Sequence, residues 1–351
     1  MADKEKIPGG SPAEMSAEEV LQKFDKESDK REMDGLWGHL ISGICILFAV
    51  FQLYTAIFGV LDAHLQRTVH LCFGLSLIYL LYPARAKWSR KAMHPADVIF
   101  ALLSVFATMY LVVEYDQLVL RAGMNTRTDI VIGLLGVVLV FEAARRTVGW
   151  PMITVALVFL AYAFAGPYMP GIMAHRGVGF DELVSHLYFT TEGIFGVPMG
   201  VSSTFIYLFI LFGAYLEATG LGKFFIDLAN ALAGWAVGGP AKVAVLSSGL
   251  MGTVSGSSVA NVAGTGSFTI PMMKKLGYRP SFAGAVEAAA STGGQLMPPV
   301  MGAAAFLMAE FVGVPYINVV KAAVIPAILY YTGIWIGVHY EARKYGLKGT
   351  P

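Results

Sequence analysis

Residues 249–302 read GLMGTVSGSSVANVAGTGSFTIPMMKKLGYRPSFAGAVEAAASTGGQLMPPVMG, and this stretch decides how the chain folds. Small and polar residues interrupt it twice, at Ser255–Ser258 and at Ser291–Gln295, and Pro298-Pro299 follows the second interruption. Lipid tolerates a broken helix only where the freed backbone is buried in protein or lines a wet cavity. Two such breaks close together therefore predict a site for an ion or a solute.

The composition around this stretch is that of a membrane protein. Of 351 residues, 56% are hydrophobic and only 14% are charged, and the mean hydropathy is +0.62. Apolar runs of about 18 or more residues indicate membrane spans. We expect an all-α polytopic membrane protein with about eight spans, near Trp37–Val60, Thr68–Pro83, Ala96–Tyr115, Asp129–Glu142, Trp150–Pro167, Val197–Ala218, Phe282–Val312 and Val319–Tyr340.

Several classes of function are not expected. A net charge of +1 indicates no nucleic-acid partner. Cys45 and Cys72 lie apart in apolar runs, which predicts neither a disulfide framework nor a metal site. The sequence has no GxSxG, HExxH, CxxC or Walker A pattern, and Ser255–Ser258 has no histidine or lysine nearby to activate a hydroxyl. We therefore expect neither an enzyme nor a bound cofactor.

Basic residues set the expected orientation, because loops rich in lysine and arginine stay in the cytosol. Two such groups fall after the second and the fourth expected spans: Arg85, Lys87, Arg90 and Lys91, then Arg145 and Arg146. The amino terminus is then cytosolic as well. Residues 1–36 are polar and lack the apolar core of a signal peptide, so we expect a cytosolic tail.

The same rule predicts a re-entrant helical hairpin. Lys223 and Lys274 are both placed inside, so the segment from about Lys242 to Met273 enters and leaves on one face. As a helix, Val243–Val254 would reach roughly 18 Å, against a hydrocarbon core of about 30 Å. Phe282–Val312 poses the opposite problem. It would be roughly 46 Å long if straight, so a broken helix is expected near Gly293–Pro299.

Two blocks follow from this pattern. Residues 37–149 hold four plain spans with few internal polar residues, and residues 150–351 hold the hairpin and the broken helix. Within the second block, apolar residues share one face of Phe180–Phe189, as in an amphipathic helix at the membrane interface. We expect the chemistry to lie in the second block.

The first break supplies one set of candidate residues that would bind the ion or the solute. The end of one helix presents carbonyl groups that suit Na⁺, and the start of the next presents N–H groups that suit an anion. Serine and asparagine add neutral oxygens, and glycine lets the backbone come close. The alternative is plain helix packing, because Gly252–Gly256 is also a GxxxG. The candidates are Ser255, Gly256, Ser257, Ser258 and Asn261.

The second break supplies the other set, namely Ser291, Thr292, Gly293, Gly294 and Gln295. Unwinding there would expose carbonyls at a similar depth, whereas a proline-kinked helix with satisfied hydroxyls is the alternative. Across both breaks, Ser255, Ser257 and Gly293 are the candidate Na⁺ ligands. Glu287, six residues before Gly293, is an intramembrane acid for which we favour a structural, hydrogen-bonded role.

These motifs resemble the large membrane subunit of TRAP transporters, the tripartite ATP-independent periplasmic systems. The resemblance is carried by GTVSGSS at 252–258, by IPMMKKLGY at 270–278 and by STGGQLMPPVMG at 291–302. It covers about residues 195–345 and is closest to the fused permease type that pairs with TAXI-type binding proteins. Residues 37–149 resemble the four-span small subunit only in layout.

The resemblance implies a function. A TRAP permease in the bacterial inner membrane takes an organic anion, namely a carboxylate such as a C4-dicarboxylate, from a periplasmic binding protein. Uptake is coupled to Na⁺ and involves an elevator-like motion. In that family the first hairpin and the following broken helix help to bind Na⁺ and line the substrate path, which corresponds to Ser255–Ser258 and Ser291–Gln295 here.

One departure stands out. The family's large subunit has two inverted repeats, whereas residues 150–351 show a linker span and one repeat. We expect either a fragment or a second polypeptide that supplies the other repeat. Two further readings stay open. One is another ion-coupled anion carrier, such as a divalent-anion symporter with similar hairpins, and the other is a non-transporting membrane scaffold or truncated fragment.

Overall fold

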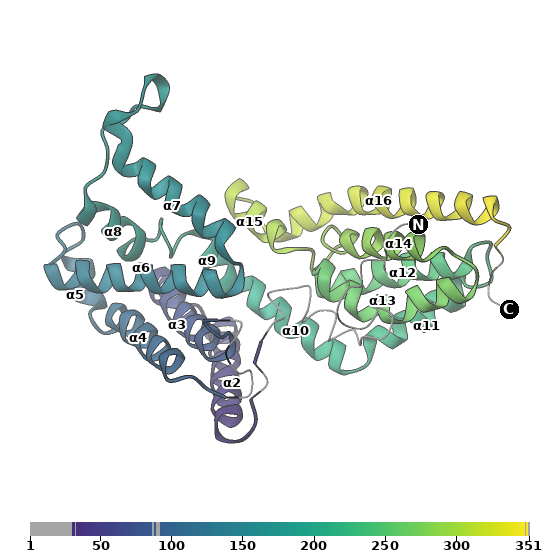
Figure 1. Ribbon diagram of the computed structural model, residues 1–351, viewed down its shortest axis with the longest axis horizontal. Coiled ribbons are helices and arrows are strands. Elements are labelled where there is room, and N and C mark those ends of the chain that lie inside the picture. Colours follow the sequence, from purple (N-terminus) through teal and green to yellow (C-terminus); the bar gives the residue numbers. More distant parts are fainter. Residues whose placement is uncertain (1–29, 32, 86–87, 89–91, 348, 350–351) are drawn as a thin grey trace, which may run out of the picture. The chain divides into compact units, whose positions relative to one another are not determined.

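Helices form every regular element in the part of the chain that the computed structural model describes, which is residues 30–31, 33–85, 88, 92–347 and 349. Contacts divide the chain into two compact units (Figure 1). The N-terminal unit ends at Leu208, and the C-terminal unit begins at Phe209. Most of the expected tail, 1–36, and the basic residues Lys87, Arg90 and Lys91 lie outside the described residues.

The N-terminal unit starts its helices where the sequence supplies caps. Pro95 opens one helix, whose Ala96 N–H donates to His94 Nδ1 at 3.2 Å. Thr126 and Asp129 form a capping box at the start of the helix that begins at Arg127. The elements are α2 (Gly35–Phe58), α3 (Ala63–Leu81), α4 (Pro95–Val113), α5 (Tyr115–Leu120), α6 (Arg127–Thr147), α7 (Trp150–Ala165), η2 (Gly166–Tyr168), η3 (Gly171–Met173), α8 (Phe180–Phe189), α9 (Val197–Val201) and the π-helical η4 (Ser202–Ile206).

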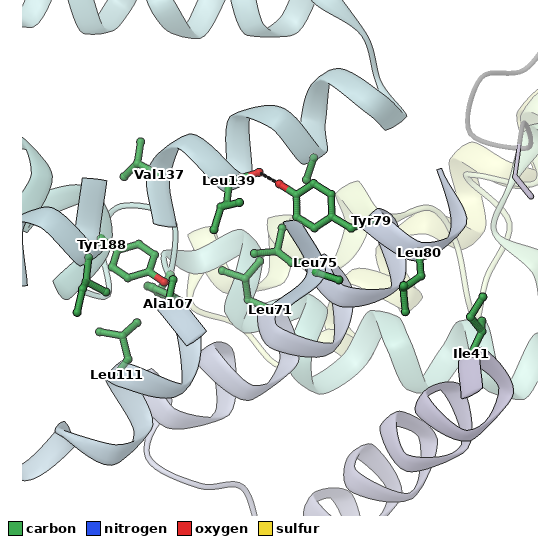
Figure 2. Packing of buried hydrophobic residues seen from close by; sticks show 14 residues of the cluster. Ile41, Leu71, Leu75, Tyr79, Leu80, Ala107, Leu111, Val137, Leu139 and Tyr188 are labelled. Atoms are coloured by element: carbon green, nitrogen blue, oxygen red, sulfur yellow. Dashed lines mark hydrogen bonds between the residues drawn. The ribbon is translucent and has the colours of Figure 1, made fainter. Parts of the chain in front are cut away.

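The apolar core of this unit lies between α3, α4, α6 and α8 (Figure 2). Tyr79 is fully buried there, and its hydroxyl donates to the carbonyl of Leu139 at 2.5 Å. Gly136 lies against the ring of Tyr188, where any side chain would collide. Dense core packing requires such close contacts between helices at small residues, and it requires that buried tyrosine hydroxyls have hydrogen-bond partners.

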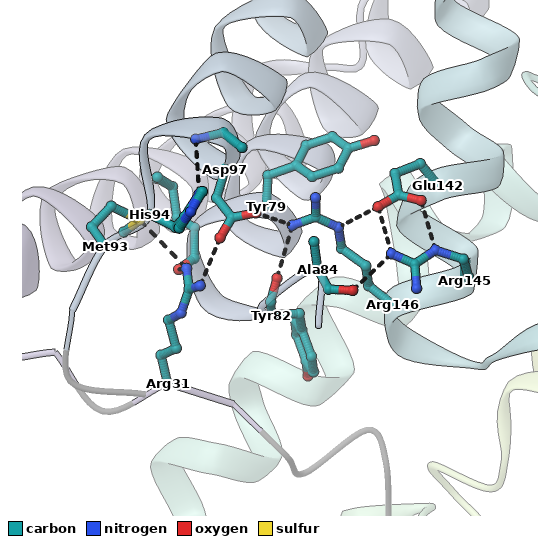
Figure 3. Close-up of polar contacts among 12 residues, drawn as sticks. Arg31, Tyr79, Tyr82, Ala84, Met93, His94, Asp97, Glu142, Arg145 and Arg146 are labelled. Atoms are coloured by element: carbon teal, nitrogen blue, oxygen red, sulfur yellow. Dashed lines mark hydrogen bonds and ion pairs between the residues drawn. The ribbon is translucent and has the colours of Figure 1, made fainter. Parts of the chain in front are cut away.

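A buried ionic network ties the start of α4 to the end of α6 (Figure 3). Asp97 is fully buried and accepts from Arg31 Nη2 at 2.6 Å and from Arg146 Nη1 at 2.7 Å. Arg146 Nε also donates to Glu142 at 2.9 Å. The backbone N–H of Arg31 donates to the carbonyl of Leu81 at 2.8 Å. The chain just before α2 is therefore held by both backbone and charge.

The C-terminal unit is built around α12, α13 and α14, with α16 packed along α12 and α14 (Figure 1). Its core holds mostly small residues, such as Ala244 and Ala283, next to the larger Met273 and Val338. Small side chains allow the helices to approach closely. The elements are α10 (Tyr207–Ala218), which continues from η4, then α11 (Leu221–Ala233), α12 (Gly239–Ser255), α13 (Ser258–Lys275), α14 (Pro280–Gly293), α15 (Ala303–Val312) and α16 (Tyr316–Lys344).

Five helices among the described residues are long and apolar enough to cross a membrane: Gly35–Phe58, Pro95–Val113, Trp150–Tyr168, Val197–Ala218 and Tyr316–Lys344. The all-α, polytopic class is thereby confirmed, and each of the five overlaps an expected span. Helices α3 and α6 lie where two further spans were expected, but they are not among these five. The count of eight spans stays a prediction.

Candidate ion and solute site

The first break is a helical hairpin. Helix α12 ends at Ser255, and Gly256 reverses the chain with φ +61°, a left-handed conformation that favours glycine. Ser257 then caps α13, since its hydroxyl accepts from the N–H of Ala260 at 3.3 Å. Helices α12 and α13 pack against each other behind this tip.

The two arms are longer than the sequence suggested. Pro240 sits in the first turn of α12, and Pro271 stays inside α13, so the arms have 17 and 18 residues. They reach roughly 26 and 27 Å, close to the hydrocarbon thickness of about 30 Å. Length alone therefore does not make the hairpin re-entrant. Neither arm is among the five helices suited to cross a membrane, and re-entry stays a prediction.

The second break is a true interruption between two helices. Helix α14 ends at Gly293 and α15 begins at Ala303. Tight turns fill the interval: Leu296 N–H donates to the Gly293 carbonyl at 3.0 Å, and Gly302 N–H donates to the Gln295 carbonyl at 2.9 Å. The break predicted near Gly293–Pro299 is thus confirmed.

The two breaks meet in space. The backbones of Gly252 and Gly294 touch, so a side chain at Gly252 would collide with Gly294, and one at Gly294 would fit only tightly. At the tip, the space where Gly256 would carry a side chain is filled by the Met301 carbonyl. Gln295 Nε2 donates to Ser258 Oγ at 3.1 Å and links the segments directly. Residues far apart in the sequence therefore share one small polar region.

Individual candidates differ in their freedom to bind anything. Ser255 Oγ is buried and has no hydrogen-bond partner within the described protein. Ser257 is exposed but already caps α13. Thr292 is exposed, and its hydroxyl donates back to the Ala288 carbonyl at 2.7 Å. Ser255 is therefore the candidate hydroxyl with the clearest capacity for a ligand.

The remaining candidates have defined neighbours. Asn261 is fully buried, and its Nδ2 donates to the Ser248 carbonyl at 2.8 Å. Gly294 faces the hairpin, whereas a side chain at Gly293 would collide with the ring of Tyr330. The two adjacent glycines therefore have different neighbours: Gly294 lies against the hairpin, and Gly293 lies against α16.

Tyrosines of α16 hold the end of α14. The hydroxyl of Tyr330 donates to the Ala289 carbonyl at 2.8 Å, and that of Tyr331 donates to the Ala290 carbonyl at 2.9 Å. Carbonyls in the last turn of a helix lack intrahelical partners. The broken end of α14 is therefore stabilised by side chains from another helix.

Glu287 forms the densest polar cluster of this unit. It is fully buried on α14 and accepts from Ser248 at 2.9 Å, Thr265 at 2.5 Å, Thr269 at 2.5 Å and Ser291 at 3.0 Å. Among the described residues, no cationic side chain pairs with it. The hydrogen-bonded acid expected from the sequence is observed, and we call these five residues the Glu287 cage.

Three members of the cage were not anticipated, namely Ser248, Thr265 and Thr269. A signal for two of them was present in the sequence. Asn261, Thr265 and Thr269 recur every four residues, which places them on one face of a helix. Glu287 and Ser291 share that spacing. A polar stripe on an otherwise apolar helix indicates a buried polar partner.

Comparison with known proteins identifies the family. Residues 135–351 match the model for the "Tripartite ATP-independent periplasmic transporter, DctM component". The chain belongs to this family. Among TRAP relatives, the C4-dicarboxylate TRAP transporter large permease protein DctM of Pseudomonas aeruginosa is 34% identical over 143 residues, which are 41% of this chain and 33% of that protein. The protein of the same name from Vibrio cholerae is 28% identical over 205 residues, 56% of this chain and 44% of that protein.

The isethionate TRAP transporter permease protein DctMQ of Oleidesulfovibrio alaskensis is 28% identical over 141 residues, which are 40% of this chain and 22% of that protein. This TRAP chain thus matches less than half the length of each of these curated relatives. It is a membrane transporter component rather than an enzyme. Both breaks and the Glu287 cage lie within the matched residues.

Proposed function

We propose that this chain is the membrane permease component of a Na⁺-coupled TRAP transporter that imports an organic anion. A periplasmic solute-binding protein of the TAXI type delivers that anion. The observation that carries the proposal is the meeting of the hairpin tip with the broken helix, next to the buried and unpartnered hydroxyl of Ser255. Helix breaks of this kind at membrane depth are where secondary transporters bind ions and solutes.

Na⁺ binds at the carboxyl end of α12 in this proposal. Ser255 and Ser257 supply hydroxyl oxygens, and the Gly293 carbonyl supplies a second lone pair beside the one used by Leu296 N–H. The end of a helix also carries partial negative charge, which favours a cation. Ser255 is the leading ligand because binding costs it no existing hydrogen bond.

The anion binds on the other side of the tip, where α13 begins. First-turn N–H groups and the partial positive charge of a helix start favour a carboxylate. Exposed Gln295 and half-buried Ser258 add side-chain donors there. The relatives are named for C4-dicarboxylate, isethionate and sialic acid, all organic acids. We therefore propose a carboxylate, with a C4-dicarboxylate as the first one to test.

In this proposal the chain lies in the bacterial inner membrane with its amino terminus in the cytosol. Helices α3 and α6 and the α14–α15 pair join the five most apolar helices to give eight spans. The α12–α13 hairpin re-enters from the cytosolic face. Residues 37–149 act as the small-subunit-like part of a fused permease, while residues 150–351 carry the linker span and the repeat with the site.

Ser255→Ala tests the Na⁺ site. The variant should fold as the wild type does, since no hydrogen bond is lost. In the assembled transporter with its binding protein, Na⁺-dependent carboxylate uptake should need about tenfold more Na⁺, as expected for one ligand worth about 1.4 kcal/mol. Ser267→Ala is the matched control, because Ser267 is exposed on α13 and bonds only to its own helix.

If the Na⁺ dependence of uptake is unchanged in Ser255→Ala, Ser255 is not a Na⁺ ligand and this part of the proposal is wrong. Uptake that needs no binding protein would instead favour another kind of ion-coupled anion carrier. Gly293→Val is a poor test, since the new side chain would collide with Tyr330 whatever the site binds.

A further inference from the structure

Three of the four hydroxyls around Glu287, those of Ser248, Thr265 and Thr269, have more than one partner within reach. Thr265 Oγ1 lies 2.8 Å from the Asn261 carbonyl, and Thr269 Oγ1 lies 3.0 Å from the Thr265 carbonyl, so both can turn from the carboxylate to backbone. Ser248 Oγ lies 3.1 Å from Thr265 Oγ1. Hydroxyl hydrogens rotate to suit their surroundings. The cage can therefore change its hydrogen-bond pattern while its heavy atoms stay in place.

This freedom satisfies both charge states of Glu287. When the side chain is ionised, the hydroxyls donate to its two oxygens. When it is protonated, its own O–H donates to a neighbouring hydroxyl, such as that of Thr269, and that hydroxyl then donates to the Thr265 carbonyl. Neither state leaves a buried polar group without a partner, which is the usual reason that a buried acid is confined to one state.

In the part of the chain that the structure describes, no charged side chain contacts Glu287 and selects one of these states. On α16, the Tyr330 and Tyr331 hydroxyls donate to backbone carbonyls of α14. Lys242 Nζ on α12 lies 3.3 Å from His339 Nδ1 of α16, and its partners do not include Glu287. The other charged groups on the helices that pack around Glu287 lie toward helix ends and contact none of its atoms: Lys274, Lys275, Arg279, Lys321, Glu341, Arg343 and Lys344.

The spacing of the oxygens suits a proton. The four hydroxyl oxygens lie 2.5 to 3.0 Å from the carboxylate oxygens, which is hydrogen-bond distance. A metal ion between them would have to separate oxygens that already touch, whereas a proton enters without displacing any of them.

We propose that Glu287 is a proton-exchange site inside the transport region. Its O–H bond breaks to leave a carboxylate, and the proton passes to water; the reverse step takes a proton from water, and nothing is oxidised or reduced. The cage joins both hairpin arms, through Ser248 and Thr265, to α14. Asn261, bonded to the Ser248 carbonyl, lies against Gly294 at the second break. Proton binding therefore changes the hydrogen bonds beside the place where the two breaks meet.

Infrared difference spectroscopy on the whole chain in lipid nanodiscs tests the proposal. The wild type should show a protonated-carboxyl band that disappears reversibly as the pH rises. Glu287→Gln should lack that band. The unfolding temperature of this variant should also depend less on pH than that of the wild type. Glu310→Gln changes an exposed acid on α15 and is the control. It should keep both the carboxyl band and the wild-type pH dependence of the unfolding temperature. The test involves neither uptake nor a binding protein, so its outcome is independent of the proposed transport function.

Thr269→Val gives a second reading should Glu287→Gln fail to fold. Loss of one hydrogen-bond donor to the ionised form should change the pH at which the band disappears. A band that ignores pH, or one that persists in Glu287→Gln, would overturn the proposal. So would a wild-type band removed by Na⁺ at constant pH, since the cage would then be a Na⁺ site.

Discussion

Asp97 of the N-terminal unit and Glu287 of the C-terminal unit are both carboxylates with 0% of their surface exposed, yet their surroundings differ in kind. Two guanidinium groups, those of Arg31 and Arg146, hold Asp97 (Figure 3). Glu287 has only neutral hydroxyls around it. The same functional group is thus charge-compensated in one unit and merely hydrogen-bonded in the other.

The difference separates a fixed structural anchor from an adjustable site. Removing the charge of Asp97 would leave buried Arg31 without its ion-pair partner and Arg146 with Glu142 alone, so Asp97 is a structural anchor. Around Glu287, the hydroxyls of Thr265 and Thr269 have backbone carbonyls as alternative acceptors when its charge changes. A search for chemistry in a membrane protein is therefore better guided by how a buried acid is compensated than by its burial.

Asp97→Asn should give the largest effect, because Arg31 and Arg146 would remain buried with less than their compensating charge. Breaking a buried ion pair by removing one partner costs about 3–5 kcal/mol. Chemical unfolding of the chain in detergent should show a loss of this size. Asp116→Asn, at an exposed position on α5, is the matched control and should be near neutral.

Glu287→Leu should cost less, although it removes an equally buried acid. The four hydroxyls lose a shared acceptor, but those of Thr265 and Thr269 keep a backbone carbonyl. We expect a loss of about 1–3 kcal/mol in the same unfolding measurement. Glu310→Leu on the exposed face of α15 is its control. If Glu287→Leu lowers the free energy of unfolding as much as Asp97→Asn does, the two acids do not differ in the way proposed.

Thr269→Val should cost about 1 kcal/mol, the usual net value of one hydrogen bond, because the side-chain shape is kept. Thr292→Val makes the same chemical change at an exposed position whose hydroxyl bonds only within its helix. A clear difference in unfolding free energy between the two variants is expected. Equal values would mean that the cage adds nothing to the stability of this unit.

Glu142→Gln should give the smallest effect, at most about 1 kcal/mol. The Glu142 side chain is 20% exposed and its partner Arg145 is 24% exposed, so solvent screens their attraction. Arg146 keeps Asp97 after the change. A loss as large as that of Asp97→Asn in parallel unfolding curves would show that the network acts as one unit rather than through its buried core.

The helical breaks could be read from the sequence because glycine and proline act locally. Gly256 adopts a conformation that other residues avoid, and the Gly293–Pro299 segment cannot continue a helix. The amphipathic helix at Phe180–Phe189 was likewise predicted and is observed. Helix lengths were less well predicted, since Pro271 lies inside α13 without ending it.

The contacts between the breaks could not be read in the same way. Nothing local to Gly252 indicates that it touches Gly294, because the contact depends on how α12 and α14 pack. The Glu287 cage also depends on contacts among α12, α13 and α14. Only the four-residue spacing of its threonines indicates a polar face in the sequence. The roles assigned to Ser255–Ser258 and Ser291–Gln295 stay predictions.

The glycine contact between α12 and α14 has a mechanical consequence. Side chains on packed helices form ridges that interlock and resist sliding. At Gly252 and Gly294 bare backbone meets bare backbone, so there is no ridge to climb. No side-chain ridge therefore interlocks α12 with α14 at this junction, and a methyl group added at Gly252 would collide with the Gly294 backbone and force the two helices apart.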